Sequence, residues 1–548
     1  MKNIFGALAL AALLFAGCVT DAGAKQIKNV IFMIPDGTSI PVVTLSRWYQ
    51  WYVEGGDERL AVDPYFCGQV KTHSSNAPIG DSAPTTSAYM TGYYSVTGFV
   101  STYPRHDPIN DIYPTDSARQ YQPLTTLAEA ARIAQGKSIG LVATCRFPHA
   151  TPADVTAHNY NRNDYSAIAR VMAHNNVDVV IAGGTSYLKQ AEREHLLKTG
   201  TLVIEDDINS FRTFKGKKLW ALFGKDHMPY DLDRDTVNIP SLAEMTVKGI
   251  EVLSQNRNGF FLMVEGSKVD FAAHANDPVG MVTEFLAFDR AVQAAIDFAK
   301  KDGQTLVVVV PDHGNSGISI GVRHLKGYDT APLSKIMDPF KDFKITASGM
   351  SDLLKTQPFD SVRPLFRRLL NIDLTKSEYE SIIKASDFTA SPIPKELRGK
   401  LNLEYETANF ITSRTFIGFT TNGHTGEDVF LAVYHPKGDI PQGLLDSPQL
   451  NRYVAKQMGL RQNALDQMTH KNFAPHHEVF SGYTYVINNP KSVDAELTVK
   501  GENGTLVIPA YTNKAYLNGK EITLESVVVY VQPNATFYLP QHLRILMH

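Results

Sequence analysis

The chain contains 548 residues and carries a formal net charge of −3; 43% of its residues are apolar and 20% are charged. This ordinary globular balance can bury a large core, and the length favours one large α/β domain with additions or two to three domains. The sequence has no polybasic tract, so nothing in it indicates a nucleic-acid-binding surface and we expect no nucleic-acid partner.

Residues 1–24 are typical of an export signal. Lys2 precedes an apolar run at 4–16, which suits a signal-peptide core and is short for a membrane span. The segment at 14–18 resembles a lipoprotein box, which would place a lipid on Cys18 and leave the protein periplasmic or tethered to the outer membrane. The Ala-Gly-Ala segment at 22–24 also fits an ordinary cleavage site before Lys25. We favour the lipoprotein over the soluble exported form and over a retained membrane anchor.

Besides Cys18, the chain has two cysteines, Cys67 and Cys145. An export compartment permits a disulfide between them. Their separation along the chain does not decide between this disulfide and two buried free thiols, so both alternatives stay open.

Strand-like apolar runs alternate with helical patterns from residue 28 to about residue 459. The expected strands lie at 29–34, 138–144, 177–182, 260–264 and 306–310, and helices are expected at 124–134 and 281–300. The strands are short, rich in β-branched residues and apolar without alternation, as is typical of strands covered on both faces. This pattern predicts an α/β fold with a mostly parallel central sheet and helices on both faces, in a catalytic domain spanning 25–475.

Two further segments depart from this pattern. At about 327–413 the sequence predicts a helical insertion, with short helices at 350–354, 362–370 and 376–386. The last segment, 476–548, predicts a small β-rich appendage with strands at 483–486, 495–499, 505–508 and 526–531, separated by Asn, Gly and Pro turns.

Four of the central strands end in side chains that can bind metal ions. The residues that follow them are Asp36, His149, Thr151, Glu265, Asp270, His274, Asp312 and His313. A lone aspartate after a strand is usually a helix cap, and a lone histidine often completes a buried polar network. Because ligands bind at the carboxyl ends of strands in open α/β sheets, the whole set predicts one converging site.

The ligand types indicate which metals such a site would take. Asp270 and His274 are four residues apart and would share one helical face, a usual spacing for two ligands of one ion. Mixed histidine nitrogen and carboxylate oxygen ligands suit zinc, whereas an all-oxygen group suits magnesium.

The stretch from Gly80 to Gly92 is rich in small and hydroxylated residues that lead into a helix-like segment. Ser82 near its start would lie at a helix N-terminus, where the helix dipole favours an alkoxide and a phosphoryl group. A serine- and threonine-rich helix cap is the simpler interpretation of this stretch taken alone.

Together these motifs resemble those of alkaline phosphatases, in order, over residues 28 to about 460. The matching segments are Asp36-Gly37, Asp81-Ser82-Ala83, His149-Ala150-Thr151-Pro152-Ala153, Asn161-Arg162-Asn163, Glu265 to Asp270 with His274, Asp312-His313-Gly314, and Thr421 to Glu427 with His424.

The resemblance implies a role for each matching residue. It implies that one zinc ion is held by Asp270, His274 and His424. The other zinc ion would be held by Asp36, Asp312 and His313. Magnesium would use Asp36, Thr151 and Glu265, with His149 beside it. Ser82 would be the nucleophile and Arg162 the group that holds phosphate.

The implied reaction is the hydrolysis of small phosphate monoesters to alcohol and inorganic phosphate through a phosphoserine. Family members are commonly dimers, so a homodimer is expected. The sequence departs from better-known relatives at Phe271, where they carry lysine or histidine, and at His149, where some carry aspartate. These changes bear on phosphate affinity and on the preference for magnesium.

Two other functions are compatible with parts of the pattern. A phosphodiesterase or sulfatase of the same superfamily shares the two-metal core. However, no C-x-P-x-R motif surrounds Ser82, and Glu265 and Thr151 supply the third-metal ligands that diesterases generally lack. A surface binding protein with a vestigial metal centre would lack a ligand, and the sequence lacks none.

Overall fold

The computed structural model describes residues 27–323 and 325–547. The predicted export signal, including the lipidation site Cys18, lies outside the described residues. Within them, no helix combines the length and the apolar character needed to cross a membrane.

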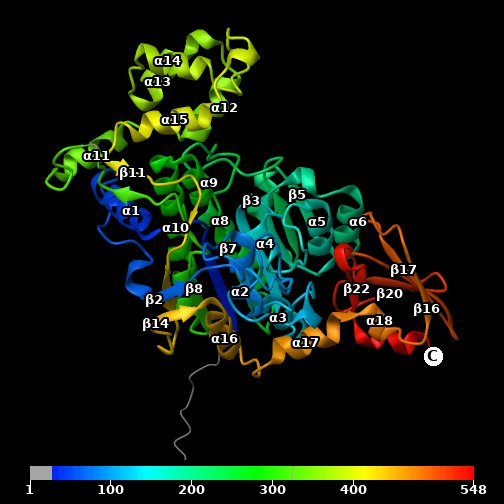
Figure 1. Cartoon of the computed structure of the whole chain (residues 1–548). Helices are drawn as coiled ribbons and strands as arrows, with labels where there is room; N and C mark the ends of the chain where they lie inside the picture. The colour runs from blue at the N-terminus through cyan, green and yellow to red at the C-terminus, as the bar shows by residue number, and fades with distance from the viewer. Residues whose placement is uncertain (1–26, 324, 548) are drawn as a thin grey trace, which may run out of the picture.

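A ten-stranded sheet forms the centre of the molecule, in the order β14-β2-β13-β8-β1-β7-β3-β4-β6-β5 (Figure 1). The strands are β1 (Asn29–Pro35), β2 (Phe66–Lys71), β3 (Ser138–Arg146), β4 (Val179–Gly183), β5 (Leu202–Glu205), β6 (Leu219–Leu222), β7 (Phe260–Gly266), β8 (Thr305–Val309), β13 (Val429–Tyr434) and β14 (Gly443–Asp446). Only β13 runs antiparallel to its neighbours β8 and β2 among these strands. The predicted α/β class with a mostly parallel sheet is confirmed.

Helices cover both faces of this sheet, and β1 shows why its sequence reads as a continuous apolar run. Val30, Phe32 and Ile34 pack into the core on one face, with α2 (Ser82–Thr91), α3 (Leu127–Gln135), α5 (Tyr165–His174) and α16 (Ser447–Gln457). Ile31 and Met33 pack into the core on the other face, with α1 (Ile40–Tyr52), α8 (Leu242–Leu253) and α10 (Pro278–Asp302). Alternate side chains of a strand point to opposite faces, so a strand covered on both sides is apolar throughout.

The five expected central strands correspond to β1, β3, β4, β7 and β8, with ends shifted by two residues or fewer. The two expected helices correspond to α3 and α10. The analysis of the sequence did not identify β2, β5, β6, β13 or β14. Strands β14, β2 and β5 lie at or next to the sheet edges, and they are partly exposed and carry polar residues, so they give no apolar run.

The helical insertion contains α11 (Leu333–Lys341), α12 (Ala347–Lys355), α13 (Val362–Leu370), α14 (Lys376–Ile383) and α15 (Leu403–Thr412). It projects from the sheet at the top of Figure 1. The three helices expected here correspond to α12, α13 and α14. Helix α14 begins with a capping box, in which Thr375 and Glu378 each accept a hydrogen bond from the other's backbone amide.

The C-terminal region is antiparallel β structure, on the right in Figure 1. One sheet contains β16 (Thr484–Asn488), β17 (Glu496–Gly501), β18 (Gly504–Pro509), β19 (Lys514–Leu517) and β20 (Lys520–Thr523). A smaller sheet pairs β22 (Thr536–Leu539) with β15 (Ala474–Pro475) and β21 (Val529–Val531). The β-rich character expected from the sequence is confirmed here.

Cys67 and Cys145 are both free thiols, half-buried and buried respectively. Of the two alternatives left open by the sequence, the structure therefore has the free thiols and not the disulfide.

Candidate active site

Three carboxylates meet because their strands are neighbours in the sheet. Strand β1 lies between β7 and β8 and is parallel to both. Asp36 follows β1, Glu265 is the penultimate residue of β7, and Asp312 lies three residues after the end of β8. All three side chains are fully buried. The expected convergence at the carboxyl edge of the sheet is therefore found for these residues.

Gly37 allows Asp270 to lie close to the backbone at the end of β1. Its φ is +65°, and a Cβ built on it would lie 2.5 Å from Oδ1 of Asp270. Its backbone amide donates a hydrogen bond of 3.0 Å to Oδ1 of Asp312. Only a residue without a side chain fits this turn, which brings Asp270 against the end of β1.

Helix α9 (Lys268–Ala275) carries Asp270 and His274 on one face, as their spacing predicts. Nε2 of His274 lies 3.4 Å from Oδ2 of Asp270, and its Nδ1 lies 2.7 Å from the carbonyl oxygen of Asn422. Burial opposes ionisation of both groups, but their mutual hydrogen bond and charge raise the pKa of His274 to about 9 and lower that of Asp270.

His424 reaches the cluster through a two-residue strand pairing. Strand β12 (His424–Thr425) pairs antiparallel with β9 (Gly314–Asn315), directly after Asp312 and His313. Nε2 of His424 lies 3.7 Å from Oδ1 of Asp270, and the ring stacks on His313 with centroids 3.7 Å apart. This pairing joins residues on opposite sides of the whole helical insertion.

Two groups of potential ligand atoms result, each with all atoms within 4.8 Å of one another. One contains Asp270, His313 and His424, and the other contains Asp36, Asp312 and His313. The second matches the set implied for one zinc ion. In the first, His313 takes the place expected for His274, which contacts Asp270 but is partly exposed at the rim.

The third expected site lies on the other side of Asp36. Oγ1 of Thr151 is 3.3 Å from Oδ2 of Asp36. His149 and Glu265 form a group of potential ligands with a residue that the sequence had not assigned to the site, Cys145. Burial and the positive charge of Arg162 lower the pKa of His149 well below its ordinary value, so its imidazole is in the neutral form that binds metals.

Ser82 is the first residue of α2, and its hydroxyl is almost fully buried. Its Oγ lies 3.3 Å from Nε2 of His313, at the edge of the metal-ligand cluster. Arg162 makes an ion pair with Asp81, the residue immediately before Ser82. The structure thus brings together the hydroxyl, the guanidinium group and the expected ligands.

The electrostatics of the cluster fit cations. Burial, together with the charges of Asp312, Asp270 and Glu265, raises the pKa of Asp36 well above its ordinary value. Burial and the charge of Asp312 raise the pKa of Glu265 to about 8. Several buried ligand atoms have no hydrogen-bond partner: Oδ1 of Asp36, Oδ2 of Asp312, Oε1 of Glu265 and Nδ1 of His149. Unpaired buried carboxylates are costly, and bound cations would offset that cost.

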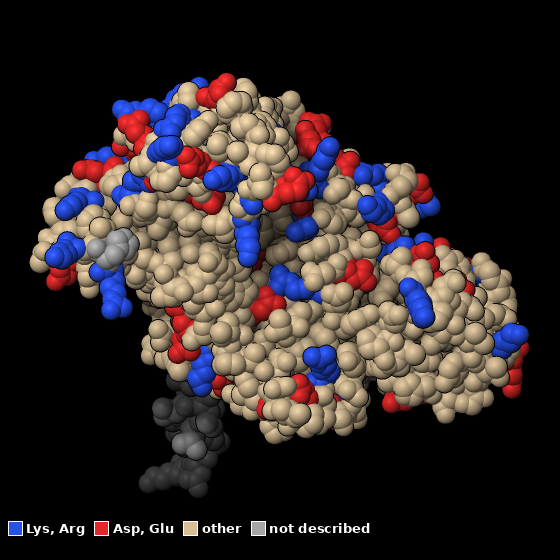
Figure 2. Space-filling view, turned by 45° about the horizontal axis from the view of Figure 1, so that its top comes forward, with Lys and Arg blue, Asp and Glu red and all other residues tan. Residues whose placement is uncertain are grey.

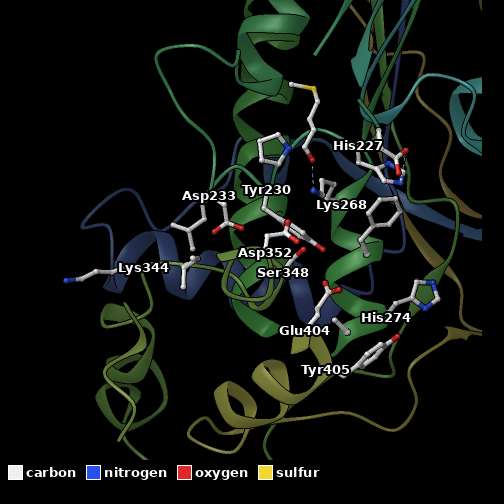
Figure 3. A pocket seen from close by; sticks show the side chains of 18 residues that line it. His227, Tyr230, Asp233, Lys268, His274, Lys344, Ser348, Asp352, Glu404 and Tyr405 are labelled. Atoms are coloured by element: carbon white, nitrogen blue, oxygen red, sulfur yellow. Dashed lines mark hydrogen bonds and ion pairs between the residues drawn. The ribbon is translucent and has the colours of Figure 1, made fainter. Parts of the chain in front are cut away.

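A pocket of about 930 Å³ adjoins the cluster through His274 and Phe271 (Figure 3). Its lining comes from the loop after β6, from α9, and from the insertion, which contributes Glu404 and Tyr405 of α15 and Ser348 of α12. The insertion therefore shapes the approach to the site. On the face shown in Figure 2, basic and acidic side chains are interspersed over the catalytic part, the insertion and the C-terminal region alike.

Asn315 is a site residue that the sequence analysis missed. Its Nδ2 donates a hydrogen bond of 2.6 Å to Oδ1 of Asp270, which fixes that carboxylate. Its position two residues after His313 was the available signal. Asp81 was recognised only as part of the serine motif, and its contact with Arg162 depends on a loop whose path the sequence does not predict.

Comparison with known proteins bears directly on this geometry. A family model described as alkaline phosphatase matches residues 27–460. Alkaline phosphatase 3 of Bacillus subtilis is 32% identical over 470 residues, which is 81% of this chain and 93% of that protein. The chain belongs to the alkaline phosphatase family. It is therefore a phosphoric monoester hydrolase, and metal binding is typical of its family.

Solved structures of alkaline phosphatases share the fold. The cold-active alkaline phosphatase from the psychrophile Shewanella sp. has a TM-score of 0.66 at 25% identity, covering 78% of this chain and 99% of that chain. The Thermus thermophilus alkaline phosphatase has a TM-score of 0.69 at 23% identity, covering 80% and 92%. The latter likeness supports the fold alone.

Proposed function

We propose that this alkaline phosphatase hydrolyses small phosphate monoesters through a phosphoserine on Ser82, at a site holding two zinc ions and a third metal ion. The observation that carries the proposal is the position of the Ser82 hydroxyl. It begins helix α2 and lies 3.3 Å from Nε2 of His313, within a cluster of buried ligands.

The expected ligands fit these ions. Asp270, His274 and His424 would hold one zinc ion, and Asp36, Asp312 and His313 the other. The third ion, magnesium in the relatives that the sequence resembles, would lie among Asp36, Thr151 and Glu265, with His149 beside it. When bound, these ions supply positive charge that stabilises an alkoxide at the nucleophile and at the leaving oxygen.

The residues of the chain orient and bind the substrate. Because Ser82 is the first residue of α2, the backbone amides and the dipole at this N-terminus would favour a phosphoryl group bound beside it. Arg162 offers a planar pair of N–H donors to two nonbridging oxygens, and its ion pair with Asp81 holds the guanidinium beside the nucleophile. Ser82 Oγ attacks phosphorus, the alcohol leaves, and water then cleaves the phosphoserine to release inorganic phosphate.

A substrate panel at alkaline pH tests this proposal, with metal content measured on the same preparation. We expect hydrolysis of phosphate monoesters to exceed that of diesters and sulfates, with two zinc ions and a third ion per chain. Preferential turnover of a diester or of a sulfate ester would replace the proposal with the corresponding superfamily activity.

Export and assembly are proposals carried by the sequence. We propose a lipid on Cys18 and a periplasmic or outer-membrane-tethered homodimer. Incorporation of labelled fatty acid and the mass of the native particle test these points. A mature protein that begins at Lys25 would instead indicate the ordinary cleavage site and a freely soluble exported enzyme.

A further inference from the structure

Cys145 lies beside the expected third metal site, on a strand whose position is fixed by the sheet. It is the penultimate residue of β3, which is parallel to β7 and pairs Ala143 with Glu265. The Cys145 side chain is fully buried, and its Sγ lies 3.5 Å from Oε2 of Glu265. The register between β3 and β7 therefore places the Cys145 thiol against the carboxylate of Glu265, an expected metal ligand.

The surroundings of this thiol have the composition of a metal site. One ligand atom each from Cys145, His149 and Glu265 lie within 4.8 Å of one another. Oε1 of Glu265 and Nδ1 of His149 are buried and have no hydrogen-bond partner. The Glu265 side chain is itself fully buried. A thiol, an imidazole and a carboxylate thus each offer a ligand atom within one small buried region.

Phe271 lies beside His149. Its ring contacts His149 with centroids 5.7 Å apart and His227 with centroids 4.7 Å apart. A phenyl ring offers no ligand atom to a metal ion, so the ligand types come from Cys145, His149 and Glu265. Magnesium usually keeps several waters and takes oxygen ligands, whereas zinc and cobalt accept sulfur and nitrogen in a compact site.

We propose that Cys145 is a thiolate ligand of the third metal ion, and that the third site of this chain takes Zn²⁺ or Co²⁺ in preference to Mg²⁺. The inference rests on the proposed function, because it assumes a metal ion at that position. On binding, the thiol loses its proton to solvent and sulfur donates an electron pair to the metal, so no oxidant or reductant is needed.

The alternative is that Cys145 is a core residue that packs beside the site without touching the ion. Buried free cysteines usually have this role. The two interpretations differ in one observable: only a ligand gives the metal a sulfur bond. The expected ligands of the two zinc sites are nitrogen and oxygen atoms, so a thiolate signal from a loaded enzyme must come from a cysteine. Besides Cys145 the chain has Cys67 and Cys18, and Cys18 is replaced by serine in every protein used for this test.

Cobalt loading of the full-length protein tests the proposal. The Cys67→Ser variant is the reference, because it removes the other thiol of the described chain, on β2, where Sγ donates to the carbonyl oxygen of Leu431. We expect this variant, loaded with three Co²⁺ per chain, to show thiolate-to-cobalt charge-transfer absorption. We expect the absorption to vanish in Cys67→Ser/Cys145→Ser. Absence of the band from the fully loaded Cys67→Ser protein overturns the proposal.

Metal competition gives a second readout. With Zn²⁺ at three equivalents per chain and Mg²⁺ in large excess, we expect the wild type to retain three zinc ions per chain. We expect Cys145→Ser to lose zinc preference at one site by on the order of tenfold or more, and to hold magnesium there. Equal zinc and magnesium contents in wild type and variant overturn the proposal. If Cys145→Ser and Cys145→Ala both fail to fold, the cobalt spectrum of Cys67→Ser decides alone.

Activity separates this inference from the proposed function. A protein that hydrolyses monoesters but shows no sulfur ligation contradicts the role of Cys145 and leaves the proposed function intact. A protein that shows the cobalt–thiolate band but turns over no monoester supports the ligand and contradicts the proposed function.

Discussion

The buried pair of Glu129 and His158 and the buried cluster at the sheet edge differ in one respect. Glu129 and His158 are both fully buried. His158 contacts Glu129 at 3.0 Å and the carbonyl oxygen of Ser101 at 3.0 Å, and Glu129 also accepts from Asn175 Nδ2 and from the Thr126 amide. The polar atoms of this pair are satisfied within the protein.

The carboxylates of Asp36, Glu265 and Asp312 at the sheet edge are equally buried, but some of their oxygen atoms make no hydrogen bond. Oδ1 of Asp36, Oδ2 of Asp312 and Oε1 of Glu265 have no hydrogen-bond partner. Burial of charge therefore does not distinguish a functional site from a structural one. The sheet-edge cluster differs because its carboxylates outnumber the one buried imidazole, His313, that lies 3.5 Å from Asp36 and 3.4 Å from Asp312. A bound cation would offset the excess of buried negative charge.

The largest effect should follow from removing the nucleophile. Ser82→Ala leaves every expected metal ligand in place, so we expect turnover to fall on the order of a thousandfold or more while zinc content stays unchanged. Steady-state kinetics and elemental analysis on one preparation check this. Activity within about threefold of wild type would contradict the role of Ser82 and direct attention to Thr85 and Thr86.

Substitution in the Glu129–His158 pair should change the stability of the protein and not its turnover. Glu129→Ala removes one partner of a buried pair, and we expect it to lower the free energy of unfolding by about 3–5 kcal/mol. The folded variant should keep the kcat of the wild type. Glu129→Gln, which retains an acceptor, is the matched control and should lose less. A large fall in kcat with unchanged stability would show that this pair belongs to the active site.

Arg162 makes an ion pair within the protein, with Asp81, and is also expected to bind phosphate, so its removal should have an intermediate effect on activity. Arg162→Ala should reduce kcat/KM by about 2–4 kcal/mol without loss of metal, because a charge-assisted bidentate contact is removed. Arg162→Lys should restore only part of the loss, since an ammonium group cannot make the paired contact. Unchanged kcat/KM for a monoester in Arg162→Ala would exclude its role as the phosphate-binding group.

Asp277 is a third kind of buried carboxylate, because its hydrogen-bond donors are backbone amides and not charged side chains. It accepts from Val279 at the start of α10 and from Ala347 of α12. Burial raises its pKa to about 7 from an ordinary value of 3.8. Its contribution to stability is therefore complete below pH 3.8 and is lost as the pH rises through about 7.

Asp277→Asn removes this titration while keeping one acceptor. Between pH 5 and pH 7, we expect the free energy of unfolding of the wild type to fall by about 2 kcal/mol relative to the variant. Denaturant unfolding of both proteins across this range checks the difference. A constant difference would show that Asp277 is ionised throughout.

The smallest effect concerns Phe271. Its phenyl ring cannot hydrogen-bond a water that bridges to phosphate, so one polar contact to bound product is absent. We expect phosphate to inhibit the wild type more weakly than Phe271→Lys, by about 1 kcal/mol in the inhibition constant at saturating metal. Equal inhibition constants would show that Phe271 has a purely structural role.

The sequence predicts the strands that are buried on both faces and the residues that belong to recognisable motifs. The apolar runs of β1 and β7 and the ligands at their carboxyl ends were identified, because burial on both faces leaves a continuous apolar run. Strand β14 was missed, since an exposed edge strand carries no such pattern. From the sequence, Cys145 was considered as a disulfide partner or a buried free thiol, but not as a site residue. Its approach to Glu265 depends on the register between β3 and β7, which periodicity does not encode.

The pairing of β9 with β12 also sets the order in which the site is assembled during synthesis. His424 enters the cluster only after the whole helical insertion has been made, while Asp270 and His313 are already present in the growing chain. The antiparallel pair of β9 and β12 joins the two ends of the segment that contains the insertion. Because the entropy of closing a loop grows slowly with its length, the insertion can lengthen or shorten at little thermodynamic cost as long as this pair forms. Its helices are thus free to diversify and reshape the approach to the metals, while the ligand geometry beneath them stays constant.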